Sequence, residues 1–223
     1  PPGEVSAYSN YGAALAGHIV SQASGLSFES YIEDRILDPL GMTRSTFRQP
    51  LPPSLAQNLA TGYTGKRNLA GYGWYQAGPS AALRTTAADM AQFMLAHLQQ
   101  GRAGDSRILQ PDSSAAMQRR QFSNHPAVSG ITPGFQELHR AGHRILWQPG
   151  DTLFFTAALF LLPEQELGLF VAYNRGRAAD APMGLLRAFL ARFFPAPPAF
   201  VTSPTPVTDE DVGRFAGSYR STR

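Results

Sequence analysis

The sequence predicts an α+β domain in which helices come first and an antiparallel sheet with a closing helix follows. Residues 10–101 contain several stretches with apolar residues at helical spacing. After Gly130 this pattern gives way to short strand-like runs separated by turns, and residues 183–194 return to helical spacing. Helices followed by a meander of strands are typical of the α+β class, and no internal repeat suggests a solenoid.

Two helices are expected near the N-terminus. The first follows the triplet Tyr8-Ser9-Asn10 and ends at Gly25, a residue type that commonly stops helices. Its predicted inner face consists of Tyr11, Ala14, Leu15, His18, Ile19 and Ala23. The second begins at Ser27 and is closed by Pro39 and Gly41. Its apolar stripe is Phe28, Tyr31, Ile32 and Ile36.

Residues 43–84 are rich in proline, glycine and aromatic residues and show no sustained period. Long irregular segments of this kind usually serve a function or pack over a site. A third helix is predicted to begin with a capping box from Thr86 to Asp89 and to end at Gly101. Its inner face is Met90, Phe93, Met94, His97 and Leu98. A shorter helix is expected over 111–119.

Four strands are predicted in the second half, over residues 135–140, 144–147, 154–162 and 167–173. The breaks at 141–142 and 163–166 are short, so neighbouring strands are expected to form antiparallel hairpins. The last helix, over 183–194, is expected to pack back onto this sheet.

Composition excludes several classes of function. The net charge is +3, and the arginines are scattered, so no basic stripe indicates a nucleic-acid partner. The chain has no cysteine, which excludes disulfides and thiolate chemistry within it, and its single lysine is Lys66. The longest apolar run, residues 154–162, is too short to span a membrane.

The chain opens on Pro1-Pro2-Gly3 and stops after residues 218–223 without completing a helix or strand. Both ends look cut, and we expect the sequence to be a piece of a longer protein. The predicted organisation is a main domain over 1–194, a proline-rich linker over 195–207, and the start of a truncated further domain over 208–223.

General catalytic signatures are missing from the sequence. It contains neither a Ser-x-x-Lys nor a Gly-x-Ser-x-Gly motif. The five histidines lack metal-ligand spacing, so no metal or other cofactor is expected. His18 and His97 lie on apolar helix faces, where a hydrogen-bonded core histidine is the expected arrangement.

The triplet Tyr8-Ser9-Asn10 admits two interpretations. Ser9 or Asn10 could be an ordinary helix N-cap, or the triplet could be one corner of an active site. Its surroundings favour the second interpretation. Residues 1–47 contain, in order, the motifs Pro2-Gly3, Tyr8-Ser9-Asn10, Ser24-Gly25, Pro39-Leu40-Gly41-Met42 and Ser45-Thr46. With these motifs the segment closely resembles a central stretch of the serine β-lactamase and penicillin-binding-protein superfamily. The branch that it most resembles is that of the class C β-lactamase-related hydrolases and esterases.

Three later segments extend the resemblance. Residues 79–90 are similar to the family's loop and helix start, and residues 161–174 to its closing hairpin. Residues 212–223 resemble the opening of a domain appended in some members. The resemblance implies a β-lactamase/transpeptidase-like fold, with an antiparallel sheet flanked by helices, that is incomplete at the N-terminus.

The resemblance also implies roles for individual residues. The family's nucleophile is the serine of a Ser-x-x-Lys motif that lies upstream of Tyr-Ser-Asn. Tyr8 would share proton shuttling with that lysine, since a phenol, whose pKa is about 10, becomes a useful base only beside cations. Asn10 would hold the lysine and the polar arm of the substrate.

The family's third motif corresponds to Gln148-Pro149-Gly150. This is a departure from the family pattern, because Gln148 carries no positive charge and Pro149 has no backbone donor. Gly150 leaves room for the substrate backbone, and the N–H of Asp151 would be an oxyanion donor. The implied substrate-binding residues are therefore Asn10, Gln148, Gly150 and Asp151, with Tyr8 as the catalytic residue.

These features predict a serine hydrolase of the esterase or peptidase type, acting through an acyl-enzyme on a small-molecule ester, amide or peptide. The chain alone, which lacks the nucleophile, is expected to be inactive. The alternative is a non-catalytic relative that binds a peptide or cell-wall fragment. An unrelated α+β binding module would require some forty ordered matches to be accidental. Export to the periplasm or cell envelope is suggested by the resemblance alone.

Overall fold

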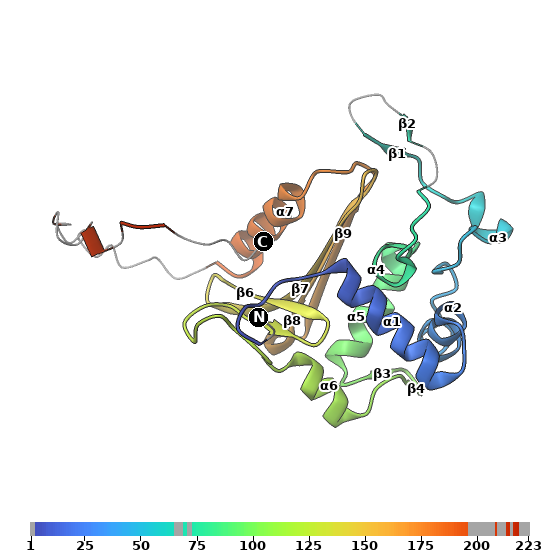
Figure 1. Ribbon diagram of the computed structural model, residues 1–223, viewed down its shortest axis with the longest axis horizontal. Helices are drawn as coiled ribbons and strands as arrows, with labels where there is room; N and C mark the ends of the chain where they lie inside the picture. The colour runs from blue at the N-terminus through green and yellow to red at the C-terminus, as the bar shows by residue number, and fades with distance from the viewer. Residues whose placement is uncertain are drawn as a thin grey trace.

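The structure is a computed structural model that describes residues 3–64, 69–70, 73–195, 208, 213–214 and 216–218. A five-stranded antiparallel sheet lies at its centre, with α7 on one side and the other long helices grouped on the other (Figure 1). The predicted α+β class, with an antiparallel sheet flanked by helices, is confirmed. Residues 196–207 of the predicted linker, and most of 208–223, lie outside the described residues, so the domain boundaries stay predictions.

The sheet has the order β5-β6-β7-β8-β9. Its strands are β5 (Ile131–Thr132), β6 (Phe135–Arg140), β7 (His143–Asp151), β8 (Thr156–Leu162) and β9 (Leu167–Tyr173), and every neighbouring pair is antiparallel. The β6–β7 turn places Ala141 and Gly142 at φ 51° and 81°, both in the left-handed region that tight two-residue hairpins require. β7 extends past the predicted end at residue 147, because pairing with β8 continues to Asp151.

The apolar run in β8 is explained by two hydrophobic cores, one on each face of the sheet. Leu159 and Leu161 pack into a core with Met90 and Met94 of α5 (Ala87–Leu98). The alternating residues Ala158, Phe160 and Leu162 pack on the other face, against Leu186 and Leu190 of α7 (Asp180–Phe193). A central strand covered on both faces has no polar side, so its side chains do not alternate in polarity.

The helical part begins with α1 (Asn10–Ser24) and α2 (Phe28–Ile32), which continues into one turn of π-helix (Glu33–Leu37). The irregular excursion predicted over 43–84 contains α3 (Pro53–Ala56), the pair β1 (Gly62–Tyr63) and β2 (Leu69–Ala70), and α4 (Gly78–Ala81). The hairpin of β3 (Arg102–Ala103) and β4 (Ser106–Arg107) precedes α6 (Pro111–Gln118). Two-residue strands of this kind, like β5, are too short to produce a period in the sequence.

The predicted inner face of α1 is largely exposed. Tyr11, Leu15 and Ile19 are 76%, 44% and 58% exposed. The helix instead approaches α4 through Gly17, its buried position, where a Cβ would come within 2.5 Å of the Pro79 side chain. Only a glycine permits that approach. Because the Gly17 side of α1 faces α4, the apolar stripe on the other side of the helix points away from α4.

Both histidine expectations need correction. His18 shares the exposed side of α1 and is not a core residue, because no described element covers that face. His97 is buried as expected, with 2% exposure, but its Nδ1 has no hydrogen-bond partner among the described residues. Its ring lies edge-on to Phe93 and Phe135, at centroid distances of 4.6 and 5.2 Å. Aromatic neighbours replace the expected polar partner.

In the part of the chain that the structure describes, no helix is long and apolar enough to cross a membrane.

Candidate functional site

The N-terminus of α1 carries the predicted tyrosine. Ser9 is the N-cap, with extended backbone, and its Oγ accepts a hydrogen bond from Gly12 N at 3.3 Å. The capping role considered for Ser9 is therefore confirmed. Capping by Ser9 leaves its neighbours available, because Tyr8 is 61% exposed and Asn10, the first helical residue, is also exposed.

The second part of the predicted site is the end of β7. Gln148 is half-buried, and its Nε2 donates to the carbonyl oxygen of Pro149 at 3.3 Å. Gly150 is exposed, and a Cβ built there would have Ala157 O as its nearest neighbour, at 4.0 Å. The backbone at Gly150 is thus open to a molecule lying along the strand.

The backbone N–H of Asp151 points away from β8. Thr152 N donates to Phe155 O at 2.8 Å at the β7–β8 hairpin, so that pair is hydrogen-bonded. Hydrogen-bonded and non-bonded pairs alternate along an antiparallel ladder, and the next pair, Asp151 with Thr156, is therefore non-bonded. On the opposite side of β7, the register with β6 reaches only as far as Trp147. The Asp151 N–H consequently lies at a sheet edge that β6 does not cover.

The Asp151 side chain has a structural task. Its Oδ1 accepts hydrogen bonds from Thr156 Oγ1 at 2.5 Å and from Arg177 N at 3.0 Å. Thr156 Oγ1 in turn accepts from Ala178 N at 3.2 Å. Together these bonds fasten the connection between β9 and α7 to the end of β7. The sequence did not indicate this role, because the partners lie far apart along the chain.

The structure places the predicted residues in two groups, Tyr8 with Asn10 and Gln148 with Gly150 and Asp151. Within the described ranges, no hydrogen bond joins the two groups. A residue that sequence reasoning missed contacts the chain two positions before Tyr8: Ser6 N donates to Asn124 Oδ1 at 2.8 Å, across 118 positions of sequence. Asn124 lies in the loop between α6 and β5, which has no motif that would have singled it out.

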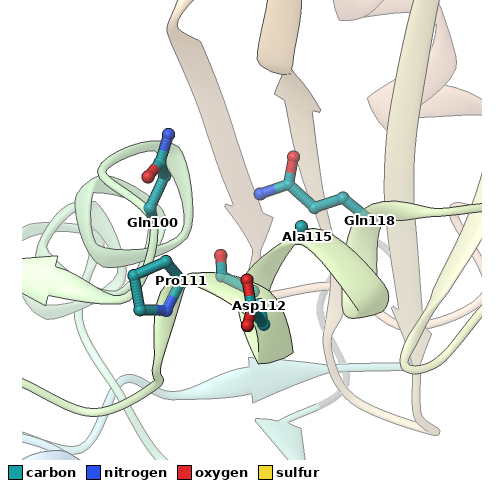
Figure 2. Close-up of a pocket in the computed structure, with 6 residues that line it drawn as sticks. Gln100, Pro111, Asp112, Ala115 and Gln118 are labelled. Carbon is teal, nitrogen blue, oxygen red and sulfur yellow. The ribbon is translucent and has the colours of Figure 1, made fainter.

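A hollow in the described surface lies away from both groups. It has a volume of about 310 Å³ and separates Gln100 from Pro111, Asp112, Ala115 and Gln118 of α6 (Figure 2). Ser114 also lines it, with a buried Oγ that has no hydrogen-bond partner among the described residues. None of the residues predicted for the site lies here, so the hollow does not bear on the chemistry considered below.

The fold is that of the serine β-lactamases and penicillin-binding proteins. A class C β-lactamase superposes with a TM-score of 0.72 at 18% identity, over 83% of this chain and 57% of its own. The octameric penicillin-binding protein homologue from Pyrococcus abyssi gives 0.65 at 24% identity, over 84% and 44%. The β-lactamase from Sulfitobacter sp. EE-36 gives 0.69 at 20% identity, over 83% and 60%.

The chain belongs to the β-lactamase family, whose sequence model matches residues 1–192. Penicillin-binding protein 4 of Amycolatopsis lactamdurans is 32% identical over 131 residues, which cover 55% of this chain and 34% of that protein. Beta-lactamase-like protein 2 of Dictyostelium discoideum is 35% identical over 92 residues, or 40% of this chain and 16% of that protein. The matched regions thus span about a third or less of these two relatives. Membership supports a serine-hydrolase-like function.

Proposed function

We propose that this chain is part of a serine hydrolase of the esterase or peptidase type that works through an acyl-enzyme. The observation that carries the proposal is the open edge at the end of β7. There, Gly150 leaves space for an extended substrate, and the Asp151 N–H points away from β8. A backbone donor in that position suits a developing oxyanion, which is stabilised by preorganised N–H groups.

In the proposed reaction a serine supplied by another part of the full-length protein attacks the substrate carbonyl. Its Oγ forms a bond to the carbonyl carbon, and its proton passes through the Tyr8 phenol to the leaving oxygen or nitrogen as that bond breaks. Water then attacks the acyl-enzyme, and its proton returns to the serine as the acid is released. Tyr8 suits this shuttle because its hydroxyl is accessible at the start of a capped helix.

The departure at Gln148-Pro149 favours a second candidate function. A neutral amide and a residue without an N–H provide weaker electrostatic attraction for a carboxylate or oxyanion than a cationic side chain would. A non-catalytic relative that binds a peptide or cell-wall fragment along the same edge is the alternative. Such a protein would bind the peptide without hydrolysing it and without forming a covalent adduct.

The test uses the full-length protein, a short-chain p-nitrophenyl ester and the variant Tyr8→Phe. We expect the rate to fall by about 10²- to 10⁴-fold, the range for losing a general acid–base group, with an unchanged melting temperature. Tyr11→Phe is the matched control, because Tyr11 is a 76% exposed tyrosine in the first turn of the adjoining helix α1 and should keep the wild-type rate. Ser9→Ala should cost about 1 kcal/mol of stability and leave the rate alone.

Equal turnover in Tyr8→Phe and an active wild type would refute the role of Tyr8. A fluorophosphonate probe tests the nucleophile separately. The adduct, located by peptide mass mapping, is expected on a serine outside residues 1–223. An adduct on a serine of this chain would contradict the proposed mechanism, and a wild type with neither adduct nor turnover would favour the binding protein.

A further inference from the structure

The segment that carries Tyr8 is held at two points. On its C-terminal side, Ser9 caps α1 through the bond from Gly12 N. On its N-terminal side, Ser6 N donates to Asn124 Oδ1 at 2.8 Å. Tyr8 lies between these two anchors, so the backbone that carries its phenol has little freedom to pivot about the start of the helix.

The loop that provides Asn124 is itself fastened to the sheet. Glu137 of β6 has a side chain that is only 2% exposed, and its Oε2 accepts from Arg120 Nε at 2.5 Å and from Gly130 N at 3.1 Å. Arg120 and Gly130 lie near the two ends of the loop, so one carboxylate holds both. Arg144 of β7 completes the cluster, with its Nε 2.6 Å from Glu137 Oε1 and its Nη2 donating to Gln118 O.

The charge state of Glu137 suits this task. Burial of the carboxyl acts to raise its pKa, but the hydrogen bonds from Arg144, Gly130 N and Arg120 outweigh burial, so the pKa is lowered. The carboxylate is therefore ionised at neutral pH and makes charge-assisted bonds to both arginines.

Bonds within the loop support its tip next to Asn124. Ala127 N donates to His125 Nδ1 at 3.1 Å, and Val128 N donates to His125 O at 3.0 Å. Arg120 Nη1 also reaches Pro126 O at 3.3 Å. The acceptor offered to Ser6 is thus presented by an ordered turn whose ends are fixed to the sheet.

We infer that Asn124 is a positioning residue that holds the Tyr8 segment for catalysis, a role that rests on the proposed function. Asn124 acts through the Ser6 backbone and supplies only an acceptor oxygen. Its effect should therefore appear in the chemical step, where a displacement of about 1 Å can cost roughly 10²-fold, and to a lesser extent in ground-state binding.

The kinetic test compares three variants of the full-length protein on the p-nitrophenyl ester. Asn124→Ala should lower kcat by about 10- to 100-fold with little change in KM, because the acceptor is lost. Asn124→Asp keeps an oxygen acceptor and should restore kcat to within a few-fold of the wild type. Asn58→Ala is the matched control, an exposed asparagine outside this loop that should leave both constants unchanged.

A second measurement does not depend on activity. In protein labelled with ¹⁵N-serine, the Ser6 amide, assigned with Ser6→Ala, should exchange with water several-fold faster in Asn124→Ala and at the wild-type rate in Asn124→Asp. An unchanged exchange rate of the Ser6 amide in Asn124→Ala would show that Asn124 does not hold this segment. Faster exchange with an unchanged kcat would overturn the positioning role. If the wild type hydrolyses no ester, the proposed function fails, while the exchange rates still decide whether Asn124 holds the segment.

Discussion

His97 is a buried histidine whose imidazole stays neutral in the folded protein at pH values where the unfolded chain would protonate it. Its ring is enclosed by aromatic residues, and burial lowers its pKa to about 4, from about 6.5 in an unfolded chain. Well above pH 6.5 the imidazole is neutral in both states. As the pH falls from 6.5 toward 4, only the unfolded chain takes up the proton, so the folded state loses stability, and the loss levels off below about pH 4.

Between pH 7.5 and pH 5 this single group should reduce the free energy of unfolding by about 2 kcal/mol. Urea denaturation of the wild type and of His97→Leu at the two pH values isolates the contribution, because the variant cannot titrate there. His18→Leu, which replaces an exposed histidine on α1, is the matched control for the substitution itself. If the wild type and His97→Leu lose equal stability between the two pH values, the burial effect on His97 is refuted.

At the scale of single elements, α1 shows how one glycine orients a helix. An alanine at Gly17 would place its Cβ 2.5 Å from Pro79 Cγ and 3.2 Å from Phe28 Cδ2. An alanine at Gly12 would have Ser9 Cβ as its nearest contact, at 3.8 Å, which is ordinary van der Waals distance. The two glycines share one helix and differ in their surroundings.

Gly12→Ala should stabilise the protein by up to about 1 kcal/mol through helix propensity, whereas Gly17→Ala should destabilise it by about 1–3 kcal/mol through overpacking. Thermal unfolding of the full-length protein and of its two variants measures this difference in stability. An equal gain from both substitutions would mean that α1 and α4 do not approach as closely as the structure has them.

At the scale of the whole molecule, the exposed stripe of Tyr11, Leu15 and Ile19 is the largest departure from the expected burial. Apolar groups on one helix face outside any core promote association and loosen tertiary packing. We therefore expect residues 1–223, expressed alone, to unfold over a broad temperature range and to bind a hydrophobic dye. The variant Leu15→Gln/Ile19→Gln should reduce dye binding without a loss of helix content. A sharp cooperative transition without dye binding would contradict this expectation.

The sequence predicts more of the fold than of the candidate site. The four main strands and the helices α5 (Ala87–Leu98) and α6 (Pro111–Gln118) were predictable from local pattern. The helices have a period that defines a face, and β8 has a continuous apolar run bounded by turns. The exposure of the apolar stripe on α1 was not predictable. Helical spacing shows that an apolar face exists, but it does not show which other element covers that face. Tyr8, Asn10, Gln148, Gly150 and Asp151 came from motif resemblance, and their roles stay predictions.

The sequence by itself determined the α+β class, the order of the hairpins and the family, since each depends on local spacing or on ordered motifs. Only the tertiary structure decided that Asn124 reaches Ser6, that Glu137 holds both ends of the loop, and that Asp151 fastens the connection between β9 and α7 while its N–H points away from β8. The physical reason is that these features are single contacts between residues far apart in the chain. Their geometry is set by how the strands and helices pack, and no local pattern of residue types records it.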